Sequence, residues 1–156
     1  MRDYEGKMKE LGLSIPEIPP PAGAYVPAVK SGNLVFCSGQ GPYKDGSQTY
    51  IGQVGSDVSL EEAYQAARIA GLNCLAEIRS VIGSLNRISR VVQIRGFVNS
   101  APDFHDQPKV VNGASELMLE IFDESGKHAR SALGTNNLPG NIPVEVEMVV
   151  EVKQNK

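Results

Sequence analysis

The chain has 156 residues, 41% of them hydrophobic, which suits one domain with a single core. Its formal net charge is −3 without a run of like charges, which argues against a surface dedicated to nucleic-acid phosphates. No stretch is apolar for long enough to span a membrane. Cys37 and Cys74 lie in apolar segments without metal-ligand spacing, and the polar N-terminus is unlike a secretory signal, so we expect a cytoplasmic protein.

The N-terminal residues 1–20 are predicted to form an arm ahead of a single domain over 21–156. Within this arm, a short helix fits Asp3 to Leu11 and ends at Gly12. The prolines between Ile15 and Pro21 then require extended chain, because successive prolines cannot continue a helix.

Two strands are predicted next, over 25–30 and 34–38, joined by a turn at Ser31-Gly32-Asn33. A weaker third strand is predicted over 50–54.

A long helix is predicted from Ser59 to Gly83, because Ser59-Leu60-Glu61-Glu62 is a capping-box pattern. The residues expected on its buried side are Ala63, Ala67, Ala70, Cys74, Ile78 and Val81. Those expected to face water are Glu62, Gln65, Arg68, Asn73 and Glu77.

The C-terminal half adds a strand over 91–98 and a second helix that begins near Pro108 and ends before Gly126. The inner face of this helix is predicted to carry Val111, Ala114, Met118 and Ile121. The turn residues Leu138-Pro139-Gly140-Asn141 then predict that the segments 128–134 and 144–148 pair as an antiparallel hairpin.

This order of elements predicts an α+β fold, with a mixed β-sheet and two crossover helices on one face. In the last strand, valines and Met148 alternate with Glu145, Glu147 and Glu151. One side of the sheet should therefore pack under the helices, and the other should meet water or another subunit.

Three motifs occur in order along the chain: Gly23 to Val29, Gly32 to Gln40, and His128 to Gly134 followed by Leu138-Pro139 and Glu145-Val146-Glu147. Together they resemble the YjgF/RidA (Rid) family, over about residues 21–152. The resemblance implies a chorismate-mutase-like fold and a homotrimer with ligand clefts between subunits. It also implies hydrolytic deamination of 2-enamines or 2-imines to 2-oxo acids and ammonia, without metal or cofactor.

The resemblance implies that Arg130 binds the substrate carboxylate and that Glu145 positions a water molecule near the imine carbon. An arginine fork suits a carboxylate better than a lysine does. The residues alone leave two simpler interpretations open. Arg130 could be a structural arginine paired with an acidic side chain such as Glu145, and Glu145 could be a solvated strand carboxylate.

Five further residues match substrate-binding positions of the family: Tyr25, Ser38, Gly39, Asn112 and Ala132. Ala132 stands where many members have cysteine, so thiol chemistry at that position is excluded. Packing of the ring is the alternative for Tyr25, and any Ser-Gly at a strand end would look like Ser38-Gly39.

Three functions therefore remain for comparison. The first is an imine or enamine deaminase acting on a small carboxylate-bearing substrate. The second is a non-catalytic trimer that binds or senses small carboxylate metabolites. The third, endoribonuclease or translation inhibitor, follows names used in the family, but the acidic balance of the chain argues against RNA as partner.

Overall fold

The computed structural model describes residues 2–18 and 20–154, so residue 19 of the predicted extended run and residues 155–156 of the predicted domain lie outside it. The helices and strands are α1 Tyr4–Glu10, β1 Ala28–Ser31, β2 Leu34–Gln40, β3 Tyr43–Lys44, β4 Ser47–Gln48, α2 Leu60–Ile82, β5 Ile88–Asn99, α3 Gln107–Phe122, β6 Ala129–Thr135 and β7 Val144–Val152. None of the helices described is long and apolar enough to cross a membrane.

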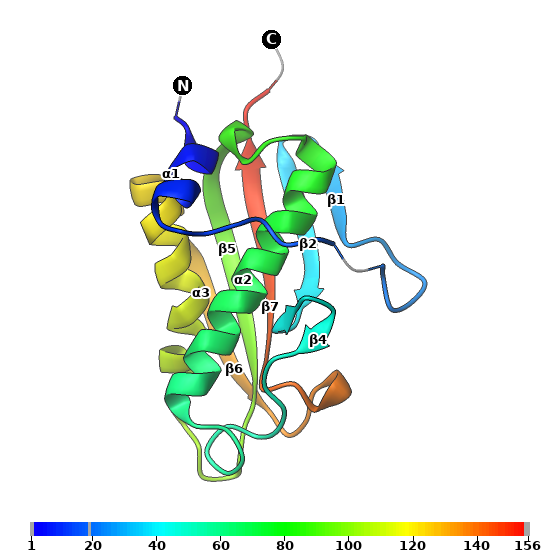
Figure 1. Cartoon of the computed structure of the whole chain (residues 1–156), viewed down its shortest axis with the longest axis vertical. Helices are drawn as coiled ribbons and strands as arrows, with labels where there is room; N and C mark the ends of the chain where they lie inside the picture. The colour runs from blue at the N-terminus through cyan, green and yellow to red at the C-terminus, as the bar shows by residue number, and fades with distance from the viewer. Residues whose placement is uncertain (1, 19, 155–156) are drawn as a thin grey trace.

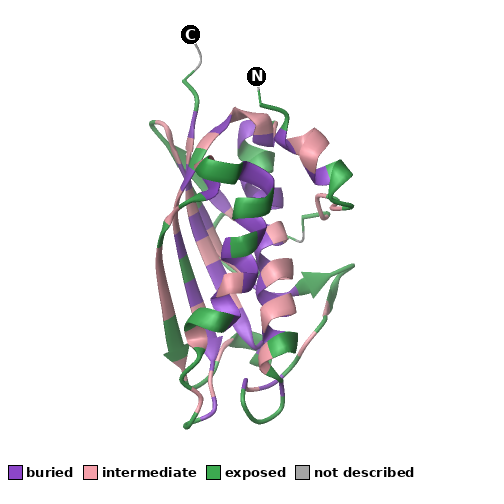
Figure 2. Cartoon of the chain, turned by 90° about the vertical axis from the view of Figure 1, so that its left-hand side faces the viewer, coloured by how far each residue is buried: buried purple, intermediate pink, exposed green. Residues whose placement is uncertain are grey.

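Five of the strands form one sheet in the order β1-β2-β7-β5-β6 (Figure 1). β5 and β6 are parallel, whereas the other neighbouring pairs are antiparallel. α2 and α3 cover one face of this sheet, and buried residues concentrate between the two layers (Figure 2). The chain therefore has the predicted α+β fold, with a mixed sheet and two helices on one face.

The predicted hairpin of the last two strands is wrong, although its turn forms. Residues Pro139–Asn141 make a tight 3-10 turn, with φ of 65° at Gly140 and 55° at Asn141. β5 lies between β6 and β7, however, and its Ile94 pairs with Arg130 on one side and Met148 on the other. A turn signal shows that the chain reverses but not which strand offers the hydrogen-bonding edge, and here α3 carries the chain across to the outer edge of β5.

The weak strand predicted over 50–54 is also wrong. Val54 makes only isolated bridges, to Val58 and Ser100. Gly52 and Gly55 have φ of 123° and 98°, which takes the backbone out of the extended conformation around Val54.

α2 begins and ends as predicted, because the Ser59–Glu62 capping box forms and Gly83 follows the helix at φ 86°. Near the C-terminal end of the helix, however, the pattern of buried and exposed residues differs from the prediction. Val81 is exposed rather than buried, and Asn73 and Glu77 are buried rather than exposed. All six residues from 73 to 78 are buried, so both sides of the helix are covered there.

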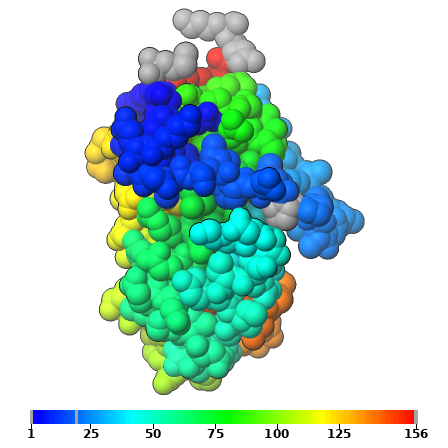
Figure 3. All heavy atoms as spheres, viewed as in Figure 1, coloured from blue at the N-terminus to red at the C-terminus, as the bar shows by residue number. Residues whose placement is uncertain are grey.

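The cover on the outer side comes from segments that helical periodicity does not reveal. The extended segment after α1 crosses α2 (Figures 1 and 3), where Leu13 and Ile15 pack against the core. Asn73 donates its amide hydrogens to the backbone carbonyls of Gly41 and Tyr43, both at 2.9 Å.

Glu77 is 2% exposed, and its Oε2 has no hydrogen-bond partner among the described residues. Burial raises the pKa of this carboxyl group.

The N-terminal helix α1 is held against α3. Tyr4 and Met8 are buried, and the Tyr4 ring meets the ring of Phe122 edge-on at 4.6 Å between centroids. Lys7 forms an ion pair with Asp123 at 2.7 Å. The segment predicted as an arm thus contributes two side chains to the core.

The contact between α2 and α3 gives a first prediction. A Cβ at Gly113 of α3 would overlap the backbone carbonyl of Tyr64, whereas a Cβ at Gly71 of α2 would lie 3.3 Å from a terminal methyl group of Leu117. Both changes to alanine gain helix propensity. We expect Gly113→Ala to lower the free energy of unfolding by about 2 kcal/mol and Gly71→Ala to change it by less than about 1 kcal/mol. Urea unfolding at matched protein concentration measures both, and equal values for the two variants would contradict this account.

Candidate active site

Arg130 lies on the edge strand β6, on the helix-covered face of the sheet, because its cross-strand partner Ile94 is buried on that face. Its Nη1 donates to Asn112 Oδ1 at 2.7 Å and to Ser115 Oγ at 3.2 Å. No ion pair joins Arg130 to any residue that the structure describes. The alternative, a structural arginine paired with an acidic side chain such as Glu145, is therefore not found among the described residues of one chain.

The two hydrogen bonds leave the other edge of the guanidinium available. Nη1 carries two hydrogens, and each has an acceptor in Asn112 or Ser115. Nε and Nη2 of Arg130 have no recorded partner in the described part of the chain. Their parallel N–H groups form the fork that binds a carboxylate through two hydrogen bonds.

Two residues beside Arg130 were not identified from the sequence. Ser115 lies one turn after Asn112 on α3 and is buried, and its Oγ is 2.8 Å from Nε2 of His128. Nδ1 of His128 is 2.6 Å from the carbonyl oxygen of Gly126. A sequence signal existed in each case. His128 precedes Arg130 by two residues, which places both on one side of an extended chain, and Ser115 follows Asn112 by three residues on a helix.

Burial lowers the pKa of His128, the Gly126 hydrogen bond opposes this effect, and the charge of Arg130 adds to the lowering. The imidazole is therefore neutral near pH 7.

Glu145 lies on the opposite, open face of the sheet, next to Gly39 at the end of β2. A Cβ at Gly39 would come within 2.8 Å of Glu145 Cδ, so the glycine leaves room for the carboxylate. Burial raises the pKa of Glu145, and the charge of nearby Glu147 raises it further. A half-buried carboxylate with a raised pKa accepts a proton more readily than a solvated one.

Ser38, Tyr25 and Ala132, the other residues predicted for the site, lie on β2, just before β1 and on β6. Ser38 precedes Gly39, and its Oγ donates to the carbonyl of Val26 at 2.9 Å. Tyr25 is 50% exposed just before β1. Ala132 lies two residues beyond Arg130 on β6 and therefore on the same face.

The sheet itself separates the two groups. Ala132 pairs with Gly96 of β5, whereas Glu145 pairs with the next residue, Phe97, and successive residues of a strand point to opposite faces. One chain thus brings Arg130 to Asn112 and Glu145 to Gly39, but it does not bring Arg130 to Glu145.

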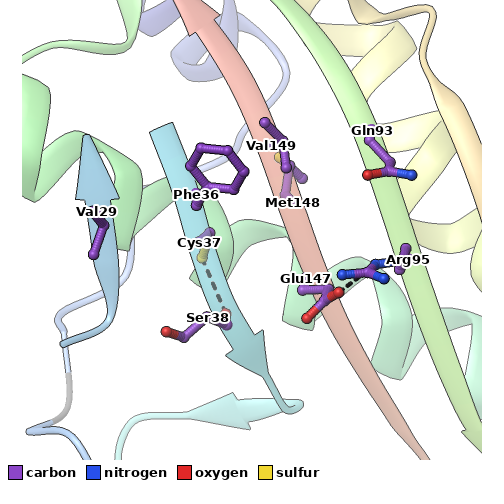
Figure 4. A pocket seen from close by; sticks show the side chains of 9 residues that line it. All are labelled: Val29, Phe36, Cys37, Ser38, Gln93, Arg95, Glu147, Met148 and Val149. Carbon is purple, nitrogen blue, oxygen red and sulfur yellow. Dashed lines mark hydrogen bonds and ion pairs between the residues drawn. The ribbon is translucent and has the colours of Figure 1, made fainter. Parts of the chain in front are cut away.

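A shallow pocket of about 200 Å³ lies on the open face (Figure 4). The Arg95–Glu147 ion pair lies on one side of it, and Val29 and Phe36 lie on the other. Among the described residues, no three His, Cys, Asp or Glu side chains gather in a way that could hold a metal ion.

A five-stranded mixed sheet with two helices on one face, Arg130 on its edge strand and Glu145 on its open face define a small α+β protein. The family described as "YjgF/chorismate mutase-like, putative endoribonuclease" matches residues 5–152. The chain belongs to this YjgF/RidA family.

Two relatives illustrate the family. Protein TCP17 from Trypanosoma cruzi is 40% identical over 146 residues, covering 93% of this chain and 91% of the relative. A 2-iminobutanoate/2-iminopropanoate deaminase from Dermatophagoides farinae is 30% identical over 142 residues, covering 90% of this chain and 95% of the relative.

A solved structure from Shewanella oneidensis MR-1, described as "a putative endoribonuclease", superposes with a TM-score of 0.93 at 34% identity. The superposition covers 97% of this chain and 100% of the other. The names in this family thus include both a deaminase and endoribonucleases.

The raised pKa of Glu145 gives a second prediction. Glu147→Gln removes a like charge and also frees the Arg95 cation, so the pKa of Glu145 should fall toward its ordinary range. Glu151→Gln, farther along the same face of β7, is the matched control and should leave it unchanged. Carboxyl ¹³C NMR titration reads out both variants, and an unchanged Glu145 titration in Glu147→Gln would contradict this cause.

Proposed function

We propose that the protein hydrolyses reactive 2-imino acids, and the 2-enamines in equilibrium with them, to 2-oxo acids and ammonia. The observation that carries the proposal is the hydrogen bonding of the Arg130 guanidinium. Its Nη1 is held by Asn112 and Ser115, while its Nε and Nη2 edge has no recorded partner among the described residues. The related deaminase from Dermatophagoides farinae acts, by its name, on 2-iminobutanoate and 2-iminopropanoate, which carry the carboxylate that such a fork binds.

In this mechanism Arg130 binds the substrate carboxylate and fixes the position of the imine carbon. Glu145 orients a water molecule and accepts a proton from it as its oxygen bonds to that carbon. The imine nitrogen takes up protons, the carbon–nitrogen bond breaks, and ammonia leaves as the carbonyl forms. Water supplies the oxygen and the protons, so the reaction balances without an oxidant or a cofactor.

The remaining predicted residues have supporting roles in this proposal. The Gly39 backbone can approach the substrate closely because it has no side chain, and its neighbour Ser38 shapes the same strand end. The exposed Tyr25 hydroxyl closes the cleft or binds the substrate carboxylate. Ala132 offers its backbone carbonyl to the water.

A second subunit completes the site in this proposal, because Arg130 and Glu145 lie on opposite faces of one sheet. The open face supports such an assembly. Val29, Phe36 and Leu133 are 51%, 46% and 51% exposed, and their strand pairings place all three on the same face as Glu145. A homotrimer that packs these faces together would bury the apolar side chains. Because Arg130 lies on the edge strand β6, it could then reach Glu145 of the next subunit around that edge.

We place this activity in the cytoplasm. Cys37 and Cys74 are both buried and unpaired, which suits a reducing compartment.

The third prediction tests the fork. Arg130→Ala should lower kcat/KM for freshly generated 2-iminobutanoate by about 100-fold or more, and Arg130→Lys by at least about tenfold, because lysine keeps the charge but loses the paired N–H groups. Ammonia release measures this. Unchanged hydrolysis by Arg130→Ala would refute the proposal.

The same preparations decide between the competing functions. Binding of 2-oxobutanoate without any ammonia release would indicate a carboxylate-binding trimer instead. RNA cleavage that persists through purification and is lost in Arg130→Ala would favour the endoribonuclease hypothesis.

The fourth prediction tests the shared site. Arg130→Ala and Glu145→Gln should each be inactive alone. Unfolded together in equal amounts and refolded, they should recover about a quarter of wild-type activity, since random assembly pairs an intact arginine with an intact glutamate at one interface in four. Each variant refolded alone is the control. If mass spectrometry shows that hybrids have formed and activity is still not recovered, each site takes Arg130 and Glu145 from the same subunit.

A further inference from the structure

His128 lies next to the arginine site, and nothing in the proposed mechanism uses it. Its ring is half-buried where the chain leads from α3 into β6. Both ring nitrogens have a partner, Gly126 on one side and Ser115 on the other. A histidine with two fixed partners, one of which also contacts Arg130, is a candidate for controlling the orientation of the arginine.

The hydrogen positions in this group follow from its chemistry. The carbonyl oxygen of Gly126 only accepts, so Nδ1 of His128 carries a hydrogen. In the neutral ring Nε2 then has none and accepts the hydroxyl hydrogen of Ser115 at 2.8 Å. The burial that lowers the pKa of His128 favours this neutral form.

Ser115 is thereby fixed as an acceptor toward the arginine. With its hydrogen directed at His128, its Oγ presents lone pairs to Nη1 of Arg130 at 3.2 Å. Asn112 Oδ1 accepts the other Nη1 hydrogen at 2.7 Å. The hydrogen bonds that link Gly126, His128, Ser115, Arg130 and Asn112 thus have one consistent assignment of donors and acceptors. They leave the Nε and Nη2 edge of Arg130 directed away from these partners.

We propose that His128 is a positioning residue: through the Ser115 hydroxyl it holds the Arg130 guanidinium in the orientation that presents its Nε and Nη2 edge to the carboxylate of the substrate. This inference rests on the proposed binding of a carboxylate by Arg130. It assigns substrate affinity, rather than the chemical step, to a histidine and a serine that never touch the substrate.

The hydrogen bonds that Arg130 donates to Ser115 and Asn112 also limit the kind of ligand. A guanidinium held by two bonds on one side cannot rotate freely, so it favours a planar anion that approaches in one orientation. A carboxylate attached to a planar imine or oxo carbon meets this condition. Ligands without a carboxylate gain nothing from the fixed fork.

The test compares four variants with wild type by steady-state kinetics on freshly generated 2-iminobutanoate and by calorimetric binding of 2-oxobutanoate. Ser115→Ala and His128→Ala should each raise KM and the Kd for 2-oxobutanoate about tenfold, with kcat changed less than about twofold, because a hydrogen bond to a charged group is weakened. His128→Gln restores an acceptor near the Nε2 position, so it should recover most of the affinity. Ser115→Ala combined with His128→Ala should be no worse than Ser115→Ala, because His128 acts through Ser115.

His105→Ala is the matched control, since His105 is the other histidine of the chain and is exposed, and it should leave both constants unchanged. Circular dichroism and elution volume check that each variant folds and assembles. Two results would overturn the inference: an unchanged affinity in His128→Ala, or a loss in His128→Gln as large as that in His128→Ala, which would indicate that only ring packing matters.

Failure of this inference is distinct from failure of the proposed function. If Arg130→Ala loses binding while His128→Ala does not, the deaminase proposal stands and the role of His128 is refuted. If no imine is hydrolysed but 2-oxobutanoate still binds, the calorimetric series decides the role of His128 alone.

Discussion

The alternation of side chains along β7 is the constraint on which the rest of the molecule depends. This strand lies in the middle of the sheet between β2 and β5, and its buried residues Val144, Val146, Met148, Val150 and Val152 pack under the helices. Glu145 and Glu147 consequently point to the open face, because a strand has only two sides. The same alternation, carried across β5 to β6, places Arg130 under the helices. The pleat of the sheet thus places Arg130 and Glu145, the two proposed catalytic-site residues, on opposite faces.

The parts of the fold that sequence could predict are those governed by local pattern. The capping box at Ser59, the inner face of α3 and the alternation in β7 depend on residues close together in the chain, and all three were predicted. The pairing of β6 with β5 depends on a distant strand, so the turn at Pro139–Asn141 suggested the wrong partner. Asn73 is buried where it binds the carbonyls of Gly41 and Tyr43, which are distant in sequence, and helical periodicity reveals neither this contact nor the burial of Glu77.

The candidate site was predictable to a similar extent. Arg130, Asn112, Glu145 and Gly39 were identified by resemblance, and the structure brings them together in two pairs. Serine and histidine are ordinary residues at a helix face and a strand entry, so the spacing of Ser115 from Asn112 and of His128 from Arg130 was too weak a signal to distinguish them. They become informative only when their hydrogen-bond distances connect them to the arginine.

The buried carboxyl group of Glu77 has a consequence for the energetics of the whole chain. Its raised pKa means that the folded protein holds this proton more tightly than the unfolded chain does, so folding is accompanied by proton uptake at pH values between the two pKa values. The stabilisation that this provides is fully present below the ordinary carboxyl range and is lost as pH rises through the raised value. Deprotonation of this one carboxyl group on α2 therefore weakens the folded state as a whole, because a charge would then lie in the interior of the protein.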